Sequence, residues 1–252
     1  MSKIVSIHSF RGGTGKSNST ANLAAQIALT GKRVGIVDTD IQSPGIHVLF
    51  NVQEEATVHS LNDYLWGKCE IQDAALDVTP NLGVPISGKI YLIPSSIKTG
   101  EIVRVLREGY DVSLLNDGFQ KLVEELNLDV LLIDTHPGLN EETLLSIAIS
   151  DVLIIIMRPD QQDYQGTAVT LDIARKLGVA RIALLVNKIP QVFDLADVRA
   201  RVERIYQIEV AGLLPHSDDM MALASAGVFS IKFPDHPISK IYRQVVTQQI
   251  LG

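Results

Sequence analysis

Seven short apolar runs, rich in β-branched residues, recur along the chain and are separated by stretches that favour helices. The runs are unbroken rather than alternating apolar and polar, which indicates strands covered on both faces, as in a parallel sheet. Such strands alternating with helices predict an α/β fold: a doubly wound, mostly parallel sheet of about seven strands with helices on both faces. The predicted strands are 3–9, 33–38, 89–94, 129–134, 151–157, 181–187 and 209–215.

Helices are expected between these strands, where apolar residues recur at helical spacing or a glycine marks the end of a helix. The segment 51–88 is the least regular and is expected to hold a short helix over 58–66. The sequence shows no internal repeat and no linker, so we expect one domain spanning 1–252. The predicted longer helices are 17–30, 114–126, 162–177, 194–206 and 238–250.

Composition excludes several classes of protein. Of the 252 residues, 46% are hydrophobic and 20% are charged, which suits a large buried core. The net charge of -7 and the lack of long basic runs disfavour strong nonspecific nucleic-acid binding. Cys69 is the only cysteine, so an intramolecular disulfide and a cysteine-based metal site are excluded. With no visible signal peptide and no apolar run of about 18 residues, we expect a cytoplasmic protein.

The segment FRGGTGKSNST follows the first predicted strand and opens an alanine-rich helix. Its three glycines let backbone N–H groups curl inward, and with the helix N-terminus they would form an anion site. Lys16 adds a cation that can reach β- and γ-phosphates, and Ser17 adds a hydroxyl for Mg²⁺. A standard phosphate loop would have its first glycine at the position of Phe10, which departs from the pattern. The predicted cofactor-binding residues are Gly12, Gly13, Thr14, Gly15, Lys16, Ser17 and Asn18.

The loop R-G-G-T-G-K-S resembles the deviant Walker A loop, K-G-G-x-G-K-[ST], of the MinD/ParA family of P-loop ATPases. That family lacks the first glycine, which accounts for Phe10. The resemblance implies ATP or ADP with Mg²⁺ as cofactors, and a homodimer that holds two ATP molecules between its subunits. Arg11 replaces the lysine that relatives extend to the partner's nucleotide, and we expect it to act there as a catalytic cation. The alternative is a surface arginine tied to its own loop or to an acidic neighbour.

Two acidic motifs extend the resemblance. GIVDTDIQSP resembles the family's switch I, which implies that Asp40 positions the attacking water and that Asp38 is an outer-shell acceptor for Mg²⁺. The alternative for Asp38 is a loop cap. DVLLIDTHPG resembles Walker B and switch II, and Asp134 would accept hydrogen bonds from Mg²⁺-bound water. His136 stands where relatives have a small apolar residue, so it either contacts the phosphate region or a partner, or is a hydrogen-bonded loop histidine.

The run LLVNKIP ends a predicted strand at Asn187. Guanine-binding proteins carry N-K-x-D, but the fourth position here is Pro190, so guanine would find no acceptor. The resemblance implies that Asn187 contacts adenine and that the loop around Pro215 flanks the ring. Ser217 stands where relatives often have aspartate, which leaves the individual base contacts open.

The function implied by the resemblance is a slowly hydrolysing ATPase switch that positions or partitions a cargo, stimulated by an activating or cargo-adaptor protein. A non-hydrolysing scaffold is disfavoured by the presence of Lys16, Ser17, Asp40 and Asp134. A metabolic P-loop ligase is disfavoured because no dedicated substrate motif is seen.

The charge pattern bears on two further partners, membranes and DNA. The segment 238–250 carries only Lys240 and Arg243 as cations, so direct membrane binding is not expected. Arginines in 174–181 and 197–207 would suit DNA, but such charges are more typical of a solvated helix face.

Overall fold

The computed structural model describes residues 2–53 and 57–252. One eight-stranded sheet runs through it in the order β3-β4-β2-β5-β1-β6-β7-β8. Neighbouring strands are parallel, except that β3 pairs antiparallel with β4. The strands are β1 (Lys3–His8), β2 (Arg33–Asp38), β3 (Leu76–Asp77), β4 (Lys89–Ile93), β5 (Val130–Asp134), β6 (Val152–Met157), β7 (Arg181–Ile189) and β8 (Val210–Pro215).

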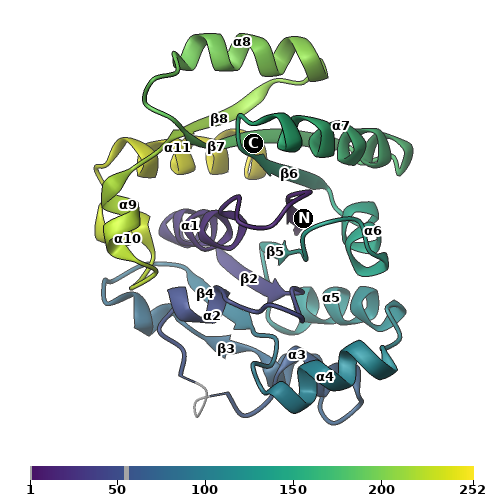
Figure 1. Ribbon diagram of the computed structural model, residues 1–252. Coiled ribbons are helices and arrows are strands. Elements are labelled where there is room, and N and C mark those ends of the chain that lie inside the picture. The colour runs from purple at the N-terminus through teal and green to yellow at the C-terminus, as the bar shows by residue number, and fades with distance from the viewer. Residues whose placement is uncertain (1, 54–56) are drawn as a thin grey trace.

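This sheet confirms the predicted fold class. All seven predicted strands are present, and the eighth, β3, is a two-residue edge strand that the sequence did not indicate. Helices cover both faces of the sheet (Figure 1). One face carries α1 (Lys16–Leu29), α2 (Ile46–Leu49), α10 (Phe229–Lys232) and α11 (Pro237–Val245). The other carries α3 (Leu61–Leu65), α5 (Ser113–Glu125), α6 (Glu141–Ala148), α7 (Gln161–Lys176) and α8 (Leu195–Tyr206).

Strand β6 shows why the apolar runs are continuous. Its side chains alternate between the two faces, and both faces are buried. Val152, Ile154 and Ile156 join the cluster that includes α1 and α11. Leu153 and Ile155 join the cluster beneath α7 and α8. Burying a full side chain of this kind contributes about 1.5–3 kcal/mol, so the two layers fix the sheet from both sides.

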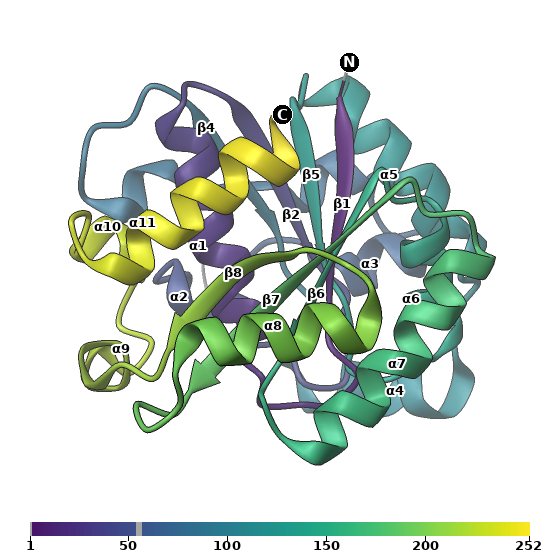
Figure 2. The same ribbon diagram turned by 90° about the horizontal axis from the view of Figure 1, so that it is seen from above.

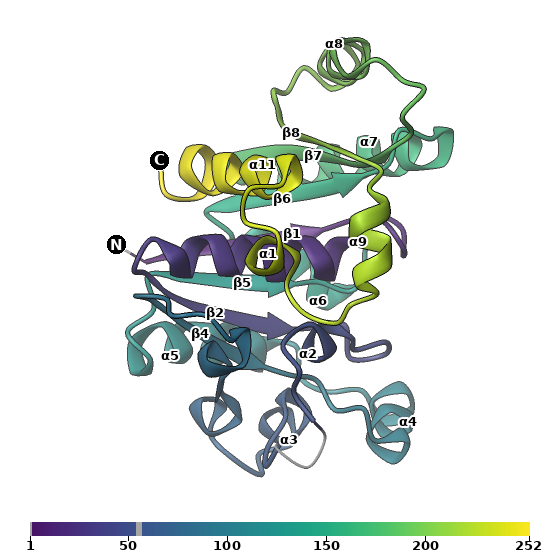
Figure 3. The ribbon, with the colours of Figure 1, turned by 90° about the vertical axis from the view of Figure 1, so that its left-hand side faces the viewer.

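Helix α1 holds the phosphate-binding segment in place, and it is buried along most of its length. It lies beside α11, as two views at right angles show (Figure 2, Figure 3). Ser19 Oγ and the fully buried hydroxyl of Tyr242 lie 3.0 Å apart and tie the two helices together. The start of α1 is therefore held at the carboxyl edge of the central strands.

Several predicted elements differ in detail from the structure. The predicted helix 238–250 is α11 followed by a π-helical turn, Val246–Ile250. The predicted helix 58–66 is shorter, because Ser60 and Asp63 form a capping box that starts α3 at Leu61. The remaining elements are α4 (Thr99–Glu108), α9 (Asp218–Leu223) and two 3₁₀ turns, Ile71–Ala74 and Thr79–Leu82. Neither α4 nor α6 was predicted. Across the two described ranges, no helix combines the length and apolarity needed to cross a membrane.

Candidate functional site: a nucleotide cleft

The chain turns from β1 into α1 through two glycines in the left-handed region, Gly13 (φ 76°) and Gly15 (φ 94°). The positive φ of Gly15 favours glycine there, and a Cβ at this position would also push the side-chain amide of Asn187 out of its place. Gly15 is the N-cap of α1 and supplies no side-chain cap. The first N–H groups of α1 therefore have no side-chain cap and could bind an anion, and the predicted phosphate contact itself stays a prediction.

The sheet register brings two predicted carboxylates together. Asp38 at the end of β2 lies opposite Asp134 at the end of β5, and both are buried. Lys16 Nζ lies 3.0 Å from Asp134 Oδ1, and Thr20 Oγ1 donates to the same oxygen over 3.0 Å. Burial raises the pKa of Asp38, and the neighbouring charge of Asp134 raises it further. The backbone N–H of Asp40 donates to Asp38 Oδ1 over 3.1 Å.

These carboxylates fit the surroundings of a hydrated Mg²⁺ bound with a nucleotide. Asp38 Oδ2 and Asp134 Oδ2 are buried, and neither accepts a hydrogen bond from any described residue. Such oxygens suit donors brought in by a ligand, including metal-bound water. Within the described ranges, no three His, Cys, Asp or Glu side chains cluster so as to hold a metal ion alone. Mg²⁺ at phosphate sites is usually held by substrate phosphates, water and one or two protein groups.

An open cleft of about 350 Å³ lies above the phosphate-binding segment. Residues 12–18 line it together with Asp40 and Ser43, which follow β2, and with His136 and Pro137, which follow β5. His136 Nδ1 lies 2.7 Å from Asp40 Oδ1. Asp40 therefore lies in the cleft, and its role in positioning water stays a prediction. His136 is both a hydrogen-bonded loop histidine and a residue of the cleft, and its place beside Asp134 in the sequence was the available signal.

Arg11 lies outside this cleft. Its Nη1 is 3.6 Å from Asp163 Oδ1 and 3.8 Å from Asp160 Oδ1, at the start of α7. The Arg11 side chain is 40% exposed, and together with Phe10 it lines a groove beside α7. In this structure the arginine is thus paired with acidic neighbours of its own chain, the alternative that the sequence left open. Its reach into a second subunit stays a prediction.

Asn187 holds the phosphate-binding segment from the side. Its Nδ2 donates to the carbonyl of Thr14 over 2.8 Å, and its Oδ1 accepts from the N–H of Lys188. Lys188 Nζ donates to the carbonyl of Gly13, also over 2.8 Å. Both polar atoms of the Asn187 side chain are thus bonded within the protein, and its contact with adenine stays a prediction. Lys188 was missed, although it completes the Asn-Lys pair seen in the sequence.

Pro215 does not line the cleft. It closes β8 opposite Ile189 of β7 and lines a neighbouring cavity of about 500 Å³ with Gln191 and His216. The predicted base-binding residues thus lie at the carboxyl ends of two neighbouring strands, β7 and β8, and of the two it is Asn187 that bonds to the phosphate-binding segment.

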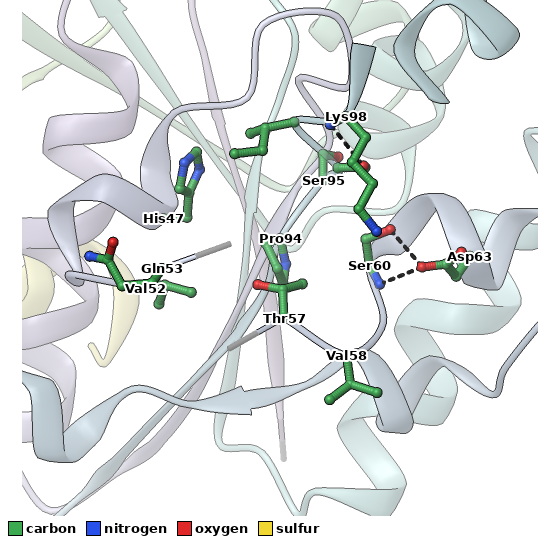
Figure 4. Close-up of a pocket in the computed structure, with 12 residues that line it drawn as sticks. His47, Val52, Gln53, Thr57, Val58, Ser60, Asp63, Pro94, Ser95 and Lys98 are labelled. Atoms are coloured by element: carbon green, nitrogen blue, oxygen red, sulfur yellow. Dashed lines mark hydrogen bonds between the residues drawn. The ribbon is translucent and has the colours of Figure 1, made fainter. Parts of the chain in front are cut away.

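A different pocket lies between the segment after α2 and the segment after β4 (Figure 4). His47, Val52, Ser60 and Asp63 line it, with Pro94–Lys98 on the other side. The cavity is about 30 Å³, roughly the room of one water molecule, and it shares no residue with the nucleotide cleft. Asp63 accepts two hydrogen bonds there from Ser60, which is a helix cap rather than a binding arrangement.

Comparison with known proteins agrees with the geometry of the cleft. A family model described as "AAA domain" matches residues 2–181. The septum site-determining protein MinD of Bacillus subtilis is 24% identical over 257 aligned residues, covering all of this chain and 90% of the relative. The chain belongs to the MinD/ParA family of P-loop ATPases.

Two further proteins align along nearly the whole chain. An uncharacterized ATP-binding protein of Methanocaldococcus jannaschii is 27% identical over 251 residues, which cover 99% of this chain and 88% of the relative. MinD of Pyrococcus horikoshii, solved in complex with Mg-ADP, superposes with a TM-score of 0.83 at 19% identity. That superposition covers 100% of this chain and 98% of the other, and it supports the P-loop fold.

Proposed function

We propose that this MinD/ParA-family protein is an ATP-dependent switch that binds and slowly hydrolyses ATP. In the ATP state it forms a homodimer with nucleotide at the interface, and hydrolysis returns it to monomers. It serves the positioning or partitioning of a cargo through an activating or adaptor protein, in keeping with its similarity to a septum site-determining protein.

The observation that carries this proposal is the meeting of Lys16, Asp40 and the Asp38–Asp134 pair at one glycine loop. The N–H groups at the start of α1 bind the phosphates, and Lys16 contributes a positive charge beside them. Ser17 and the two buried carboxylates would hold a hydrated Mg²⁺, which would supply charge neutralisation on the phosphates when bound. Asp40 lines the cleft in a position to accept a hydrogen bond from the attacking water.

Arg11 supplies the link to dimerisation in this proposal. A planar guanidinium can bind phosphate through two parallel hydrogen bonds, which a lysine cannot do. Its present partners, Asp160 and Asp163, are 3.8 and 3.6 Å away, which is beyond hydrogen-bond distance, and the buried Asp163 already accepts hydrogen bonds from Arg158. The partner's nucleotide would therefore compete readily for this side chain.

The base-binding part of the proposal favours adenine. Pro190 removes the acidic acceptor that guanine would need, and the loops after β7 and β8 lie side by side. Asn187 and Pro215 are the residues that we assign to the base. Competition between ATP and GTP for a fluorescent ATP analogue tests this assignment, and equal displacement by the two nucleotides would contradict it.

Phosphate release tests the hydrolytic function. We expect wild-type protein with ATP and Mg²⁺ to release phosphate above background, and Asp40→Ala to lose this activity while still binding the nucleotide. Asp117→Ala, which removes an exposed carboxylate on α5, is the matched control and should behave as wild type. Equal rates for wild type and Asp40→Ala would instead indicate a non-hydrolysing scaffold.

Light scattering with ATP and Mg²⁺ tests the dimer. We expect Arg11→Ala to remain monomeric with reduced turnover, and Arg11→Lys, which restores the family's residue, to dimerise. Lys176→Ala, an exposed cation near the end of α7, controls for a general loss of positive charge. Unchanged dimerisation and turnover in Arg11→Ala would remove the proposed role of this residue.

A further inference from the structure

His136 joins two loops that the fold brings together from different strands. Asp40 follows β2 and His136 follows β5, and these strands are neighbours in the sheet. Nδ1 of His136 lies 2.7 Å from Oδ1 of Asp40, a short distance typical of a hydrogen bond to a charged group. Both side chains are largely buried, with 24% of His136 and 11% of Asp40 exposed. The contact is therefore partly shielded from water and stronger than a surface pair.

The backbone on both sides of this contact is already fixed. The N–H of Asp40 donates to Asp38 Oδ1, and the carbonyl of Asp40 accepts from the N–H of Ser43. The carbonyl of His136 accepts from Thr143 Oγ1 over 3.3 Å, at the start of α6. With the main chain held, the remaining freedom of Asp40 lies in its side-chain torsions. Among the described residues, it is His136 that restrains these torsions, through its contact with Oδ1.

The two carboxylate oxygens of Asp40 differ as a result. Oδ1 accepts from His136, whereas no hydrogen bond from a described residue reaches Oδ2. An ionised carboxylate only accepts hydrogen bonds, so Nδ1 of His136 carries the proton in this contact. One oxygen is thereby fixed by the protein, and the other is left to accept from a water molecule in the cleft.

We propose that His136 is a positioning residue for hydrolysis, which orients the Asp40 carboxylate through its Nδ1–H and links the loop after β2 to the loop after β5. The inference rests on the proposed hydrolytic role of Asp40. It concerns geometry, because an unrestrained carboxylate would spend much of its time turned away from the attacking water, and misplacement of a catalytic group is costly to the rate. Nucleotide affinity is set by the phosphate loop and should be unaffected.

Three substitutions separate this role from a general structural one. His136→Ala removes the donor, and we expect kcat to fall on the order of tenfold, as for loss of one hydrogen bond to a charged group. KM and the affinity for a fluorescent ATP analogue should stay within about twofold. His136→Asn places its Nδ2 where Nδ1 of the histidine lies, so it should recover most of the rate. His136→Gln matches the other ring nitrogen instead and should not.

A second measurement needs neither ATP nor turnover. Nitrogen-15 NMR of the histidine rings should show His136 with its proton on Nδ1 in the nucleotide-free wild type, because the hydrogen bond selects that tautomer. In Asp40→Ala this preference should be lost. An unchanged tautomer in Asp40→Ala would overturn the inference.

Together, the kinetics and the NMR separate a failure of the positioning role of His136 from a failure of the proposed ATP hydrolysis. A wild type no more active than Asp40→Ala overturns the proposed hydrolysis, and NMR alone then decides whether His136 orients Asp40. An active wild type with kcat unchanged in His136→Ala overturns the inference and leaves the proposed function standing. Equal recovery by Asn and Gln also overturns it, because the position of the donor would then not matter.

Discussion

His8 provides a prediction whose size can be worked out from its surroundings. It is the last residue of β1, directly before the phosphate-binding segment, and it is fully buried. Its Nδ1 lies 2.8 Å from Thr135 Oγ1, and that hydroxyl donates its own proton to the carbonyl of Ile7. Nδ1 must therefore be the donor to Thr135. Nε2 is a buried nitrogen with no partner among the described residues, so protonating it would place an unpaired charge in the interior.

These surroundings lower the pKa of His8 to about 3, mainly through burial and then through the nearby positive charge of Lys16. Below about pH 6.5 the unfolded chain binds a proton on His8, whereas the folded protein keeps this side chain neutral. The stability contributed by neutral His8 is fully present above that pH and is lost as the pH falls toward 3. Between pH 7 and pH 5 the loss works out at about 2 kcal/mol of unfolding free energy.

The assay is urea unfolding of the nucleotide-free protein at both pH values, comparing wild type with His8→Asn. Asparagine keeps a donor near the Nδ1 position and does not titrate. The comparison between variants is essential, because Asp38 acts with the opposite sign. Its raised pKa means that the folded state holds a proton that the unfolded state releases, so Asp38 makes folding more favourable as the pH falls.

We expect the wild type to lose about 2 kcal/mol more than His8→Asn on going from pH 7 to pH 5. The absolute stability of the variant can be lower without affecting this difference. Histidine NMR gives an independent check, since the ring of His8 should not titrate in that interval. The reasoning would be refuted if the unfolding free energies of the two proteins changed equally between pH 7 and pH 5, or if the His8 ring titrated near its ordinary pKa.

Two further predictions concern packing. A Cβ on Gly166 would lie 2.2 Å from the Phe10 ring, so Gly166→Ala should destabilise the protein by about 1–3 kcal/mol, whereas Gly100→Ala, which meets open space, should not. Thermal unfolding of the two variants checks this, and equal melting temperatures would contradict the close packing. Leu122 of α5 is fully buried and Leu106 of α4 is 59% exposed. Leu122→Ala should therefore cost about 2–5 kcal/mol and Leu106→Ala less than about 0.5 kcal/mol in urea unfolding, and similar losses would show that α4 is packed more tightly than described.

The sheet and the phosphate-binding segment could be predicted because their signals are local. Continuous apolar runs require burial on both faces, and the positive φ angles of Gly13 and Gly15 follow from the glycine pattern itself. The proximity of Asp38 and Asp134 could also be predicted, because each ends a recognisable strand. Carboxyl ends of parallel strands share one edge, and only the strand order had to be known.

The missed features depend on contacts between distant residues or on weak local signals. Arg11 lies beside Asp160 and Asp163, which are about 150 positions away in the sequence, and no local pattern indicates such a contact. Helix α4 was missed because it contributes no buried residue, so it lacks the core contacts that usually accompany a helix. The His136–Asp40 contact depends on side-chain torsions across two loops, which a motif cannot specify.

The side-chain bonds from Asn187 and Lys188 to the carbonyls of Thr14 and Gly13 have a consequence for the speed of nucleotide capture. They give the phosphate loop its shape in the absence of ligand, so little conformational entropy remains to be lost on binding. The nucleotide should then associate about as fast as a ligand binds to a rigid site, with no slow phase from ordering of the loop. Because Asn187, the residue that we propose for the base, also holds the carbonyl of Thr14, a nucleotide whose base displaces Asn187 would loosen the loop that holds its phosphates. Base and phosphate recognition would then be thermodynamically coupled, although they follow different strands.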